Sequence, residues 1–290
     1  MEKPVILGDV IKKTFILCLL FCCQVQAKVN IAASIMPLAD WARNIGGTNV
    51  AVTTILKPGE SPHTFTPRPS QMIMLKKADL FIEVGLGLEF WAGKMVSAAD
   101  NPKLVTLVLG GLVSTNKADR HEGGVNPHVW LSPRLAVLFC EAIRDRLCEI
   151  DPARAGQYRK NYERYAGILR ALDSEIRARI GAWRTKEFVC FHPAYVYFER
   201  DYGLRHVAIE EIPSRSPSPS ELAAVVDEVR RIRARAVFVE PQLDPKVGWT
   251  VAKETGASVE ILDPEGGFPD RDTYIKLMRF NLGQMEKALK

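Results

Sequence analysis

From residue 28 onward, short runs of apolar and β-branched residues alternate with longer segments in which apolar residues recur every three or four positions. Runs of the first kind predict strands, and segments of the second kind predict helices. Because strands and helices alternate, we expect an α/β protein whose parallel sheets are covered by helices on both faces. The predicted strands are Val29–Ser34, Val50–Leu56, Leu80–Val84, Leu104–Leu109, Glu187–Phe191, His206–Ile209, Ala236–Val239 and Ser258–Leu262.

The segment Pro152–Trp183 interrupts this alternation. Its tyrosines and aliphatic residues recur at spacings of three and four, and Asp151 with Pro152 forms a helix N-cap followed by proline in the first turn. A helix of roughly 30 residues would be about 45 Å long. We interpret it as a strut, with an N-terminal lobe at 28–150, a connecting helix at 151–184 and a C-terminal lobe at 185–290. The alternative is a long helix packed on a single domain.

The first 27 residues have the pattern of a signal peptide. Lys12 and Lys13 precede the apolar run Phe15–Cys23, and Val25-Gln26-Ala27 has the small-x-small pattern of a cleavage site. The apolar run is too short to span a bilayer, and a buried N-terminal helix is the alternative. Lipid attachment at Cys23 is disfavoured, because Phe21 and Cys22 are poor residues for the two positions that precede a lipid-modified cysteine. We therefore expect export to the periplasm.

Charge and cysteine content exclude two other classes of protein. The chain of 290 residues has 39 basic and 34 acidic residues, a net charge of +5, which is too mild to indicate nucleic-acid binding. Cys140 and Cys148 lie eight positions apart on a predicted helix, too far for a disulfide. With Cys190 they are expected to be small buried hydrophobic residues rather than a disulfide framework.

Three of the five histidines share one setting with an aspartate. His63, His128 and His192 each follow a predicted strand or the loop after it, and Asp263 comes directly after the last strand. Ligands of open parallel sheets bind beyond the carboxyl ends of the strands. Two of these residues precede the predicted strut and two follow it. If the lobes face each other, all four side chains meet in one cleft.

Three imidazoles and one carboxylate suit zinc at about 2.0–2.2 Å and suit calcium or magnesium poorly. Four protein ligands would leave no open position for an activated water, which favours binding over hydrolysis. Other interpretations remain for single residues. Asp263 is a possible turn former before Pro264, and Glu240 is a rival ligand at another strand end. His121 lies in a polar loop that might collect metal, and His206 at the start of a strand is expected to be structural.

At these residues the sequence resembles the zinc- and manganese-binding solute-binding proteins of bacterial ABC importers, called cluster A-I. The resemblance covers essentially the whole mature chain. It is carried by Gly59-Glu60-Ser61-Pro62-His63-Thr64-Phe65-Thr66-Pro67, by Asn126-Pro127-His128-Val129-Trp130-Leu131-Ser132-Pro133, by Phe191-His192-Pro193-Ala194-Tyr195, by Phe238-Val239-Glu240-Pro241-Gln242 and by Ile261-Leu262-Asp263-Pro264.

The resemblance implies two Rossmann-like lobes with parallel sheets, joined by one long rigid helix, with the metal between the lobes. It implies His63, His128, His192 and Asp263 as the metal ligands. In this family a histidine at the third position accompanies zinc, and a glutamate there accompanies manganese. The expected function is zinc capture and delivery to the membrane permease of an ABC importer, by a monomer without enzymatic activity. Because a long strut resists hinge bending, release is expected from local movement around His63 and His192.

Three departures from the family pattern leave metal affinity and preference open. The histidine-rich loop of many zinc-binding members is absent, Pro213-Ser214-Arg215-Ser216 replaces a glycine-lysine-glutamate segment, and Asn126 stands where aspartate is usual. The alternatives are manganese or iron binding by the same fold, a metal-stabilised surface adhesin, and a zinc hydrolase with Glu240 or Glu60 as its base.

Overall fold

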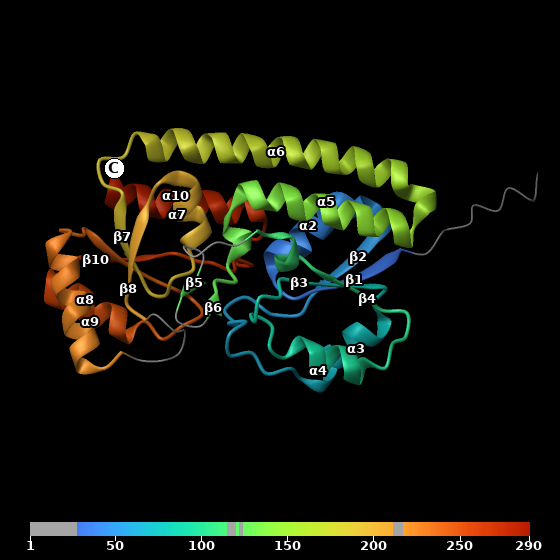
Figure 1. Cartoon of the computed structure of the whole chain (residues 1–290), viewed down its shortest axis with the longest axis horizontal. Coiled ribbons are helices and arrows are strands. Elements are labelled where there is room, and N and C mark those ends of the chain that lie inside the picture. Colours follow the sequence, from blue (N-terminus) through green and yellow to red (C-terminus); the bar gives the residue numbers. More distant parts are fainter. Residues whose placement is uncertain (1–27, 115–119, 122–123, 211–216) are drawn as a thin grey trace, which may run out of the picture.

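The computed structural model describes residues 28–114, 120–121, 124–210 and 217–290, so the predicted signal peptide and the segment Pro213–Ser216 lie outside the described residues. Two four-stranded sheets, both entirely parallel, form the framework (Figure 1). All eight predicted strands are present, each within one or two residues of its expected bounds. The first sheet contains β1 (Val29–Ala33), β2 (Val50–Thr54), β3 (Leu80–Glu83) and β4 (Val105–Val108); the second contains β7 (Glu187–Cys190), β8 (Arg205–Ala208), β9 (Ala236–Val239) and β10 (Ser258–Ile261).

The two sheets have the same topology. The first has the order β2-β1-β3-β4, and the second, read from its other edge, has the order β8-β7-β9-β10. In each, the first strand along the chain lies between the second and the third. The chain therefore reverses its direction of winding between the first and third strands, where a crevice opens beyond the strand ends. The two lobes with parallel sheets that the resemblance implies are present, and they are built alike.

Helices connect the strands and cover the sheets (Figure 1). Proline in the first turn starts several of them, because its missing N–H would be unpaired there anyway. Side-chain oxygens of Ser132, Ser218 and Thr273 accept hydrogen bonds from backbone N–H groups in the first turn of the helix that each precedes. The helices are α2 (Met36–Gly46), α3 (Pro69–Lys77), α4 (Ala92–Ala99), α5 (Pro133–Ile150), α6 (Ala155–Gly181), α7 (Val196–Tyr202), α8 (Pro219–Arg231), α9 (Lys246–Thr255) and α10 (Tyr274–Leu289).

The predicted long helix is α6. It has 27 residues and follows a 3-10 turn at Pro152–Arg154, so its length is about 40 Å at 1.5 Å per residue. Figure 1 shows α6 running over both lobes, with α5 beside it. The lobe boundaries at 28–150 and 185–290 stay a prediction. Among the described residues, no helix is both long and apolar enough to cross a membrane.

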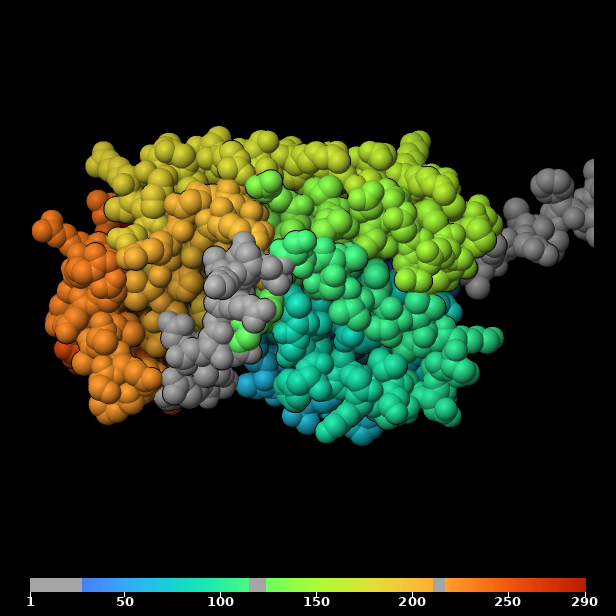
Figure 2. All heavy atoms as spheres, viewed as in Figure 1, coloured from blue at the N-terminus to red at the C-terminus, as the bar shows by residue number. Residues whose placement is uncertain are grey.

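A single hydrophobic core joins the two lobes beneath α6. It includes Trp41 and Phe81 of the first lobe, Leu169 of α6, and Phe238 and Met278 of the second lobe. Figure 2 shows the lobes side by side under this layer of helices. The core is reinforced by the Asp40 carboxylate, which accepts hydrogen bonds from the Tyr165 hydroxyl (3.1 Å) and the Tyr274 backbone N–H (3.0 Å). A continuous core fixes the lobes relative to each other and resists hinge motion.

Candidate metal centre

His63, His128 and His192 meet at one point between the lobes. His63 lies in the loop between β2 and α3, His128 precedes a 3-10 turn at Val129–Leu131, and His192 follows β7. The Nε2 atom of His128 lies 3.0 Å from Nε2 of His63 and 3.0 Å from Nε2 of His192. His128 and His192 are each 2% exposed, whereas His63 is half-buried. The structure thus brings together side chains that lie 129 residues apart in the sequence.

The hydrogen bonds of His128 and His192 fix which ring nitrogen carries the proton. Asn126 Oδ1 lies 2.9 Å from Nδ1 of His128, and Glu240 Oε1 lies 2.6 Å from Nδ1 of His192. Both partner atoms are acceptors, so each Nδ1 must donate. Each Nε2 then presents its lone pair to the shared point. Lone pairs that face each other repel unless a cation lies between them, so this tautomer pattern fits a metal ion.

The spacing of the nitrogens is close to what zinc requires. With zinc–nitrogen bonds of about 2.0–2.1 Å and tetrahedral angles, ligand nitrogens lie roughly 3.4 Å apart. The separations of 3.0 Å would need to open by only a few tenths of an ångström. The three ligand atoms all lie within 4.8 Å of one another, and among the described residues no other group of three histidine, cysteine or acidic side chains meets this condition.

Asn126 links the loops that carry two of these histidines. Its Oδ1 also accepts a hydrogen bond from the His128 backbone N–H (3.0 Å), and its Nδ2 donates to the Pro193 carbonyl oxygen (2.6 Å). The Asn126 side chain is 0% exposed, so water cannot replace these bonds. An amide can accept from an N–H and donate to a carbonyl at this position, whereas an ionised carboxylate can only accept. The asparagine therefore matches its surroundings better than the aspartate of the usual family pattern.

Asp263, the predicted fourth ligand, is not part of the imidazole group. It is 0% exposed, and its Oδ2 lies 2.5 Å from Nε of Arg271. Its Oδ1 accepts hydrogen bonds from Gln242 Nε2 (2.7 Å) and from the backbone N–H groups of Glu265 (3.0 Å) and Gly266 (2.9 Å). The carboxylate thus has four donors, three at Oδ1 and one at Oδ2, and an ion that approached Oδ2 would meet the charge of Arg271.

The other candidates have different roles in the structure. Glu240 hydrogen-bonds to Nδ1 of His192 and so orients this imidazole. Glu60 lies in the His63 loop, where it accepts from the Lys57 backbone N–H and pairs with Arg68. His206 pairs with Glu199. His121 lies in the short strand β5 (Arg120–His121), which pairs with β6 (Gly124–Val125).

Several buried acidic side chains lie around the centre. Burial raises the pKa of Glu265 well above its usual value, and the nearby charges of Asp263, Glu89 and Glu240 raise it further. Oε2 of Glu240 and Oε2 of Glu265 are buried and have no hydrogen-bond partner among the described residues. A cation bound here would offset the cost of ionising these buried acids, so their presence is compatible with a metal ion at this place. Sequence reasoning missed Glu265 and Arg271, because no motif singles them out.

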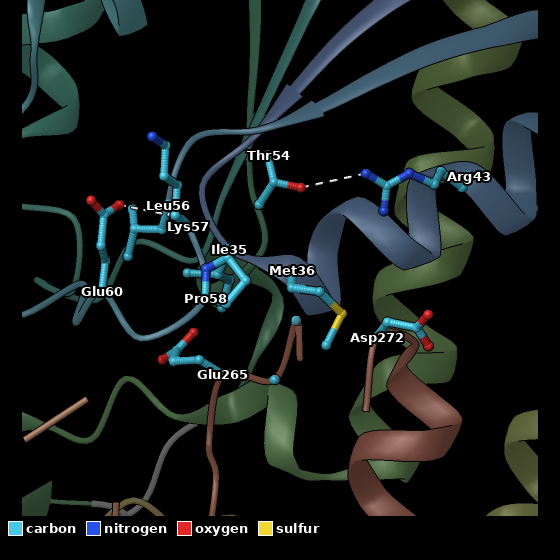
Figure 3. Close-up of a pocket in the computed structure, with 12 residues that line it drawn as sticks. Ile35, Met36, Arg43, Thr54, Leu56, Lys57, Pro58, Glu60, Glu265 and Asp272 are labelled. Carbon is cyan, nitrogen blue, oxygen red and sulfur yellow. Dashed lines mark hydrogen bonds between the residues drawn. The ribbon is translucent and has the colours of Figure 1, made fainter. Parts of the chain in front are cut away.

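A cavity of about 230 Å³ separates the loop of His63 from the second lobe (Figure 3). Lys57, Pro58 and Glu60 line it from the His63 loop, and Glu265 and Gly266 line it from the loop after Asp263. Figure 3 shows Arg43 at the far side of the cavity pointing toward Thr54, away from Glu265. The His63 loop is therefore not closely packed on this side and has space for local movement.

Comparison with known proteins gives the same class as the fold and site. The family model described as "Zinc-uptake complex component A periplasmic" matches residues 31–288. A zinc-binding lipoprotein of Streptococcus pneumoniae, AdcA, is 30% identical over 285 residues, which cover 92% of this chain but 56% of that protein. The iron-binding protein YfeA of Yersinia pestis is 30% identical over 270 residues, covering 90% of this chain and 86% of YfeA.

A solved structure extends the match to three dimensions. The crystal structure of ZnuA aligns with a TM-score of 0.83 and 29% identity, covering 91% of this chain and 99% of ZnuA. The fold and the site together define a metal-binding solute-binding protein with two α/β lobes on a long helix. The chain belongs to the family of periplasmic zinc-uptake component A. It spans about half the length of the streptococcal relative named above.

Proposed function

We propose that this protein captures zinc between its lobes through Nε2 of His63, His128 and His192 and delivers it to the membrane permease of an ABC importer. One observation carries the proposal. Nε2 of His128 lies 3.0 Å from Nε2 of His63 and from Nε2 of His192, and the two most buried imidazoles have their Nδ1 atoms held by acceptors. Such an arrangement is preorganised for a single cation.

The ligand set supports zinc over harder ions. Imidazole nitrogen suits borderline cations, while manganese, calcium and magnesium prefer oxygen ligands. Asp263, the fourth ligand expected from the sequence, pairs with Arg271 and would contact the ion only if Arg271 released it. We propose binding rather than catalysis, since Glu240, the nearest candidate base, already accepts a hydrogen bond from His192 through one oxygen. The loops of His128 and His192 are also joined by the hydrogen bonds of Asn126, and a fixed set of ligands suits the binding of an ion better than an enzymatic reaction.

Release would proceed by movement of the His63 loop. The continuous core under α6 opposes rotation of the lobes, whereas His63 is the most exposed of the three histidines and its loop borders the cavity of Figure 3. Withdrawal of one imidazole leaves two ligands, which lowers the affinity enough for transfer. The permease is the proposed partner, and it would trigger this withdrawal by docking across both lobes of a monomer in the periplasm.

Calorimetry on metal-free protein tests the capture step. The expected result is one tight zinc site per chain, and a stoichiometry of zero would end the proposal. Replacing His63 or His192 by alanine should weaken zinc binding by at least about 10-fold. His206→Ala is the matched control, because His206 pairs with Glu199 and lies outside the imidazole group.

Uptake of labelled zinc by cells with and without the gene tests delivery to the importer. Equal uptake by the two kinds of cell would refute delivery.

Manganese or iron is the second candidate cargo. This alternative is supported by YfeA, which is named an iron-binding protein and is as similar to this chain, at 30% identity, as the zinc-binding AdcA. Competition between zinc and manganese on the purified protein separates the two. A manganese affinity equal to the zinc affinity would favour this alternative, and elemental analysis of protein purified without chelators would identify the ion bound in cells.

A further inference from the structure

Arg271 is held in one orientation by its neighbours. It lies in the loop between β10 and α10 and is 8% exposed. Its guanidinium carbon lies 4.4 Å from the ring centroid of Phe268 and 4.4 Å from that of Phe280. Nη1 pairs with Asp270 at 2.8 Å, and Nε pairs with Asp263 at 2.5 Å. Two aromatic contacts and two carboxylates leave this planar group little freedom to turn away.

The backbone of Asp263 is equally fixed. Its N–H donates to Asn281 Oδ1 (2.9 Å), and its carbonyl oxygen accepts from Asn281 Nδ2 (2.7 Å). The Asp263 loop nevertheless lies beside the loop of His128. The carbonyl of the next residue, Pro264, accepts a hydrogen bond from Trp130 Nε1 (2.7 Å), and the Trp130 ring lies 5.0 Å from that of His128. Asp263 is thus in a loop beside the metal centre, and its carboxylate is bound to a competing cation.

We propose that Arg271 is a positioning residue that withholds Asp263 from the captured ion and so shifts the selectivity of the site toward zinc. The inference rests on the proposed function and adds how the preference among ions is set. Zinc can be held by three imidazoles with a water or another group in the fourth position. Manganese depends more on oxygen ligands. Because Arg271 holds the carboxylate of Asp263, it lowers the affinity for manganese more than the affinity for zinc.

The chemistry of the pair supports this assignment. Arginine stays charged under all ordinary conditions, so protonation does not release the carboxylate. A divalent ion that binds Asp263 Oδ2 must compete with Arg271 Nε for this oxygen and must also approach a fixed positive charge. Both costs fall on any ion that needs the carboxylate. An ion that is satisfied by His63, His128 and His192 avoids them.

The variant Arg271→Met tests the proposal, because methionine keeps an unbranched stem between the two phenylalanine rings and removes the charge. We expect the manganese affinity to rise by at least about 10-fold, with the zinc affinity changed by less than about 3-fold. Both constants would be measured by competition with a chelator of known affinity. Arg279→Met is the matched control: this arginine of α10 is exposed and pairs with Glu175, and its loss should leave both affinities unchanged.

The double variant Arg271→Met/Asp263→Asn identifies the cause. If the freed carboxylate is the new ligand, the gain in manganese affinity should disappear in the double variant. A gain that persists there, or an unchanged manganese affinity in Arg271→Met, would overturn the proposal. A wild-type chain that binds neither ion would instead overturn the proposed function itself, so the two failures are distinguishable.

Structures of the wild-type protein loaded with zinc give a test that does not depend on the folding of the variants. The expected result is an ion in contact with three imidazole nitrogens and an intact bond between Arg271 Nε and Asp263. Contact between the zinc ion and an Asp263 oxygen, with the Arg271 bond broken, would refute the role assigned to Arg271.

Discussion

Replacement of Asn126 by aspartate tests whether the loops that carry His128 and His192 are joined by an amide. The substitution changes one NH₂ group to an oxygen. In the native protein this NH₂ group donates to the Pro193 carbonyl at 2.6 Å, while Oδ1 accepts from the His128 backbone N–H and lies beside its Nδ1. Asn126→Asp keeps the acceptor and places a carboxylate oxygen against a carbonyl oxygen.

The size of the effect follows from burial. Asn126 is 0% exposed and Pro193 is buried, so water cannot supply the lost donor. Leaving a buried acceptor unsatisfied costs about 1–3 kcal/mol, and the new charge strengthens the remaining bonds to His128 only in part. We expect a net loss of about 2 kcal/mol in the free energy of unfolding of the metal-free protein. For a chain of this size that corresponds to a fall of roughly 4–8 °C in Tm.

The assay is urea and thermal unfolding in the presence of a chelator at pH 7.5. Asn161→Asp is the matched control, since Asn161 Nδ2 donates to the Ile45 carbonyl at 2.8 Å from a half-buried position that water can reach. Asn161→Asp should lower the free energy of unfolding by less than about 1 kcal/mol. If the free energy of unfolding of Asn126→Asp were within about 0.5 kcal/mol of wild type, or no lower than that of the control, the hydrogen bond from Asn126 to Pro193 would not stabilise the protein.

Three further predictions concern pH and buried hydrogen bonds. Zinc affinity should fall by at least about tenfold between pH 7.5 and pH 5.5, since free imidazole titrates near pH 6.5 and protons compete with the ion; equal isotherms at both values would contradict imidazole ligation. Burial raises the pKa of Glu83 from 4.5 to about 7, so the native state holds this proton more tightly than the unfolded chain and stability is lost as pH rises toward 7. Glu83→Gln should therefore gain stability relative to wild type at pH 8 but not at pH 4, by about 1–2 kcal/mol after allowance for partial exposure, and a pH-independent difference in denaturant unfolding would refute this. Ser132→Ala should cost about 2–3 kcal/mol in the same assay, because Ser132 caps α5 and donates to buried Asp201 at 2.5 Å; a loss below 1 kcal/mol would mean that neither bond matters.

Much of the fold was predictable from local pattern. Eight apolar runs became eight strands, and the tyrosine and leucine spacing of 152–183 became α6, because both elements depend on periodicities that neighbouring residues set. The convergence of His63, His128 and His192 was also predictable, since the ends of parallel strands meet at one edge of each sheet and the two lobes repeat one topology. Six of the eight strands are shorter than expected by one or two residues, β8 is shifted by one residue, and β9 has the expected bounds.

Tertiary structure alone decided what each polar side chain contacts. Asp263 stands at a strand end as predicted, but its carboxylate pairs with Arg271, eight residues later, in a loop whose path no periodicity specifies. Asn126 reaches Pro193 across 67 positions, and Glu240 reaches His192 across 48. A sequence determines which residues follow a strand. Which donors a buried carboxylate contacts is decided only when the chain packs and excludes water. Hydrogen bonds act over a few ångströms in space and not along the chain.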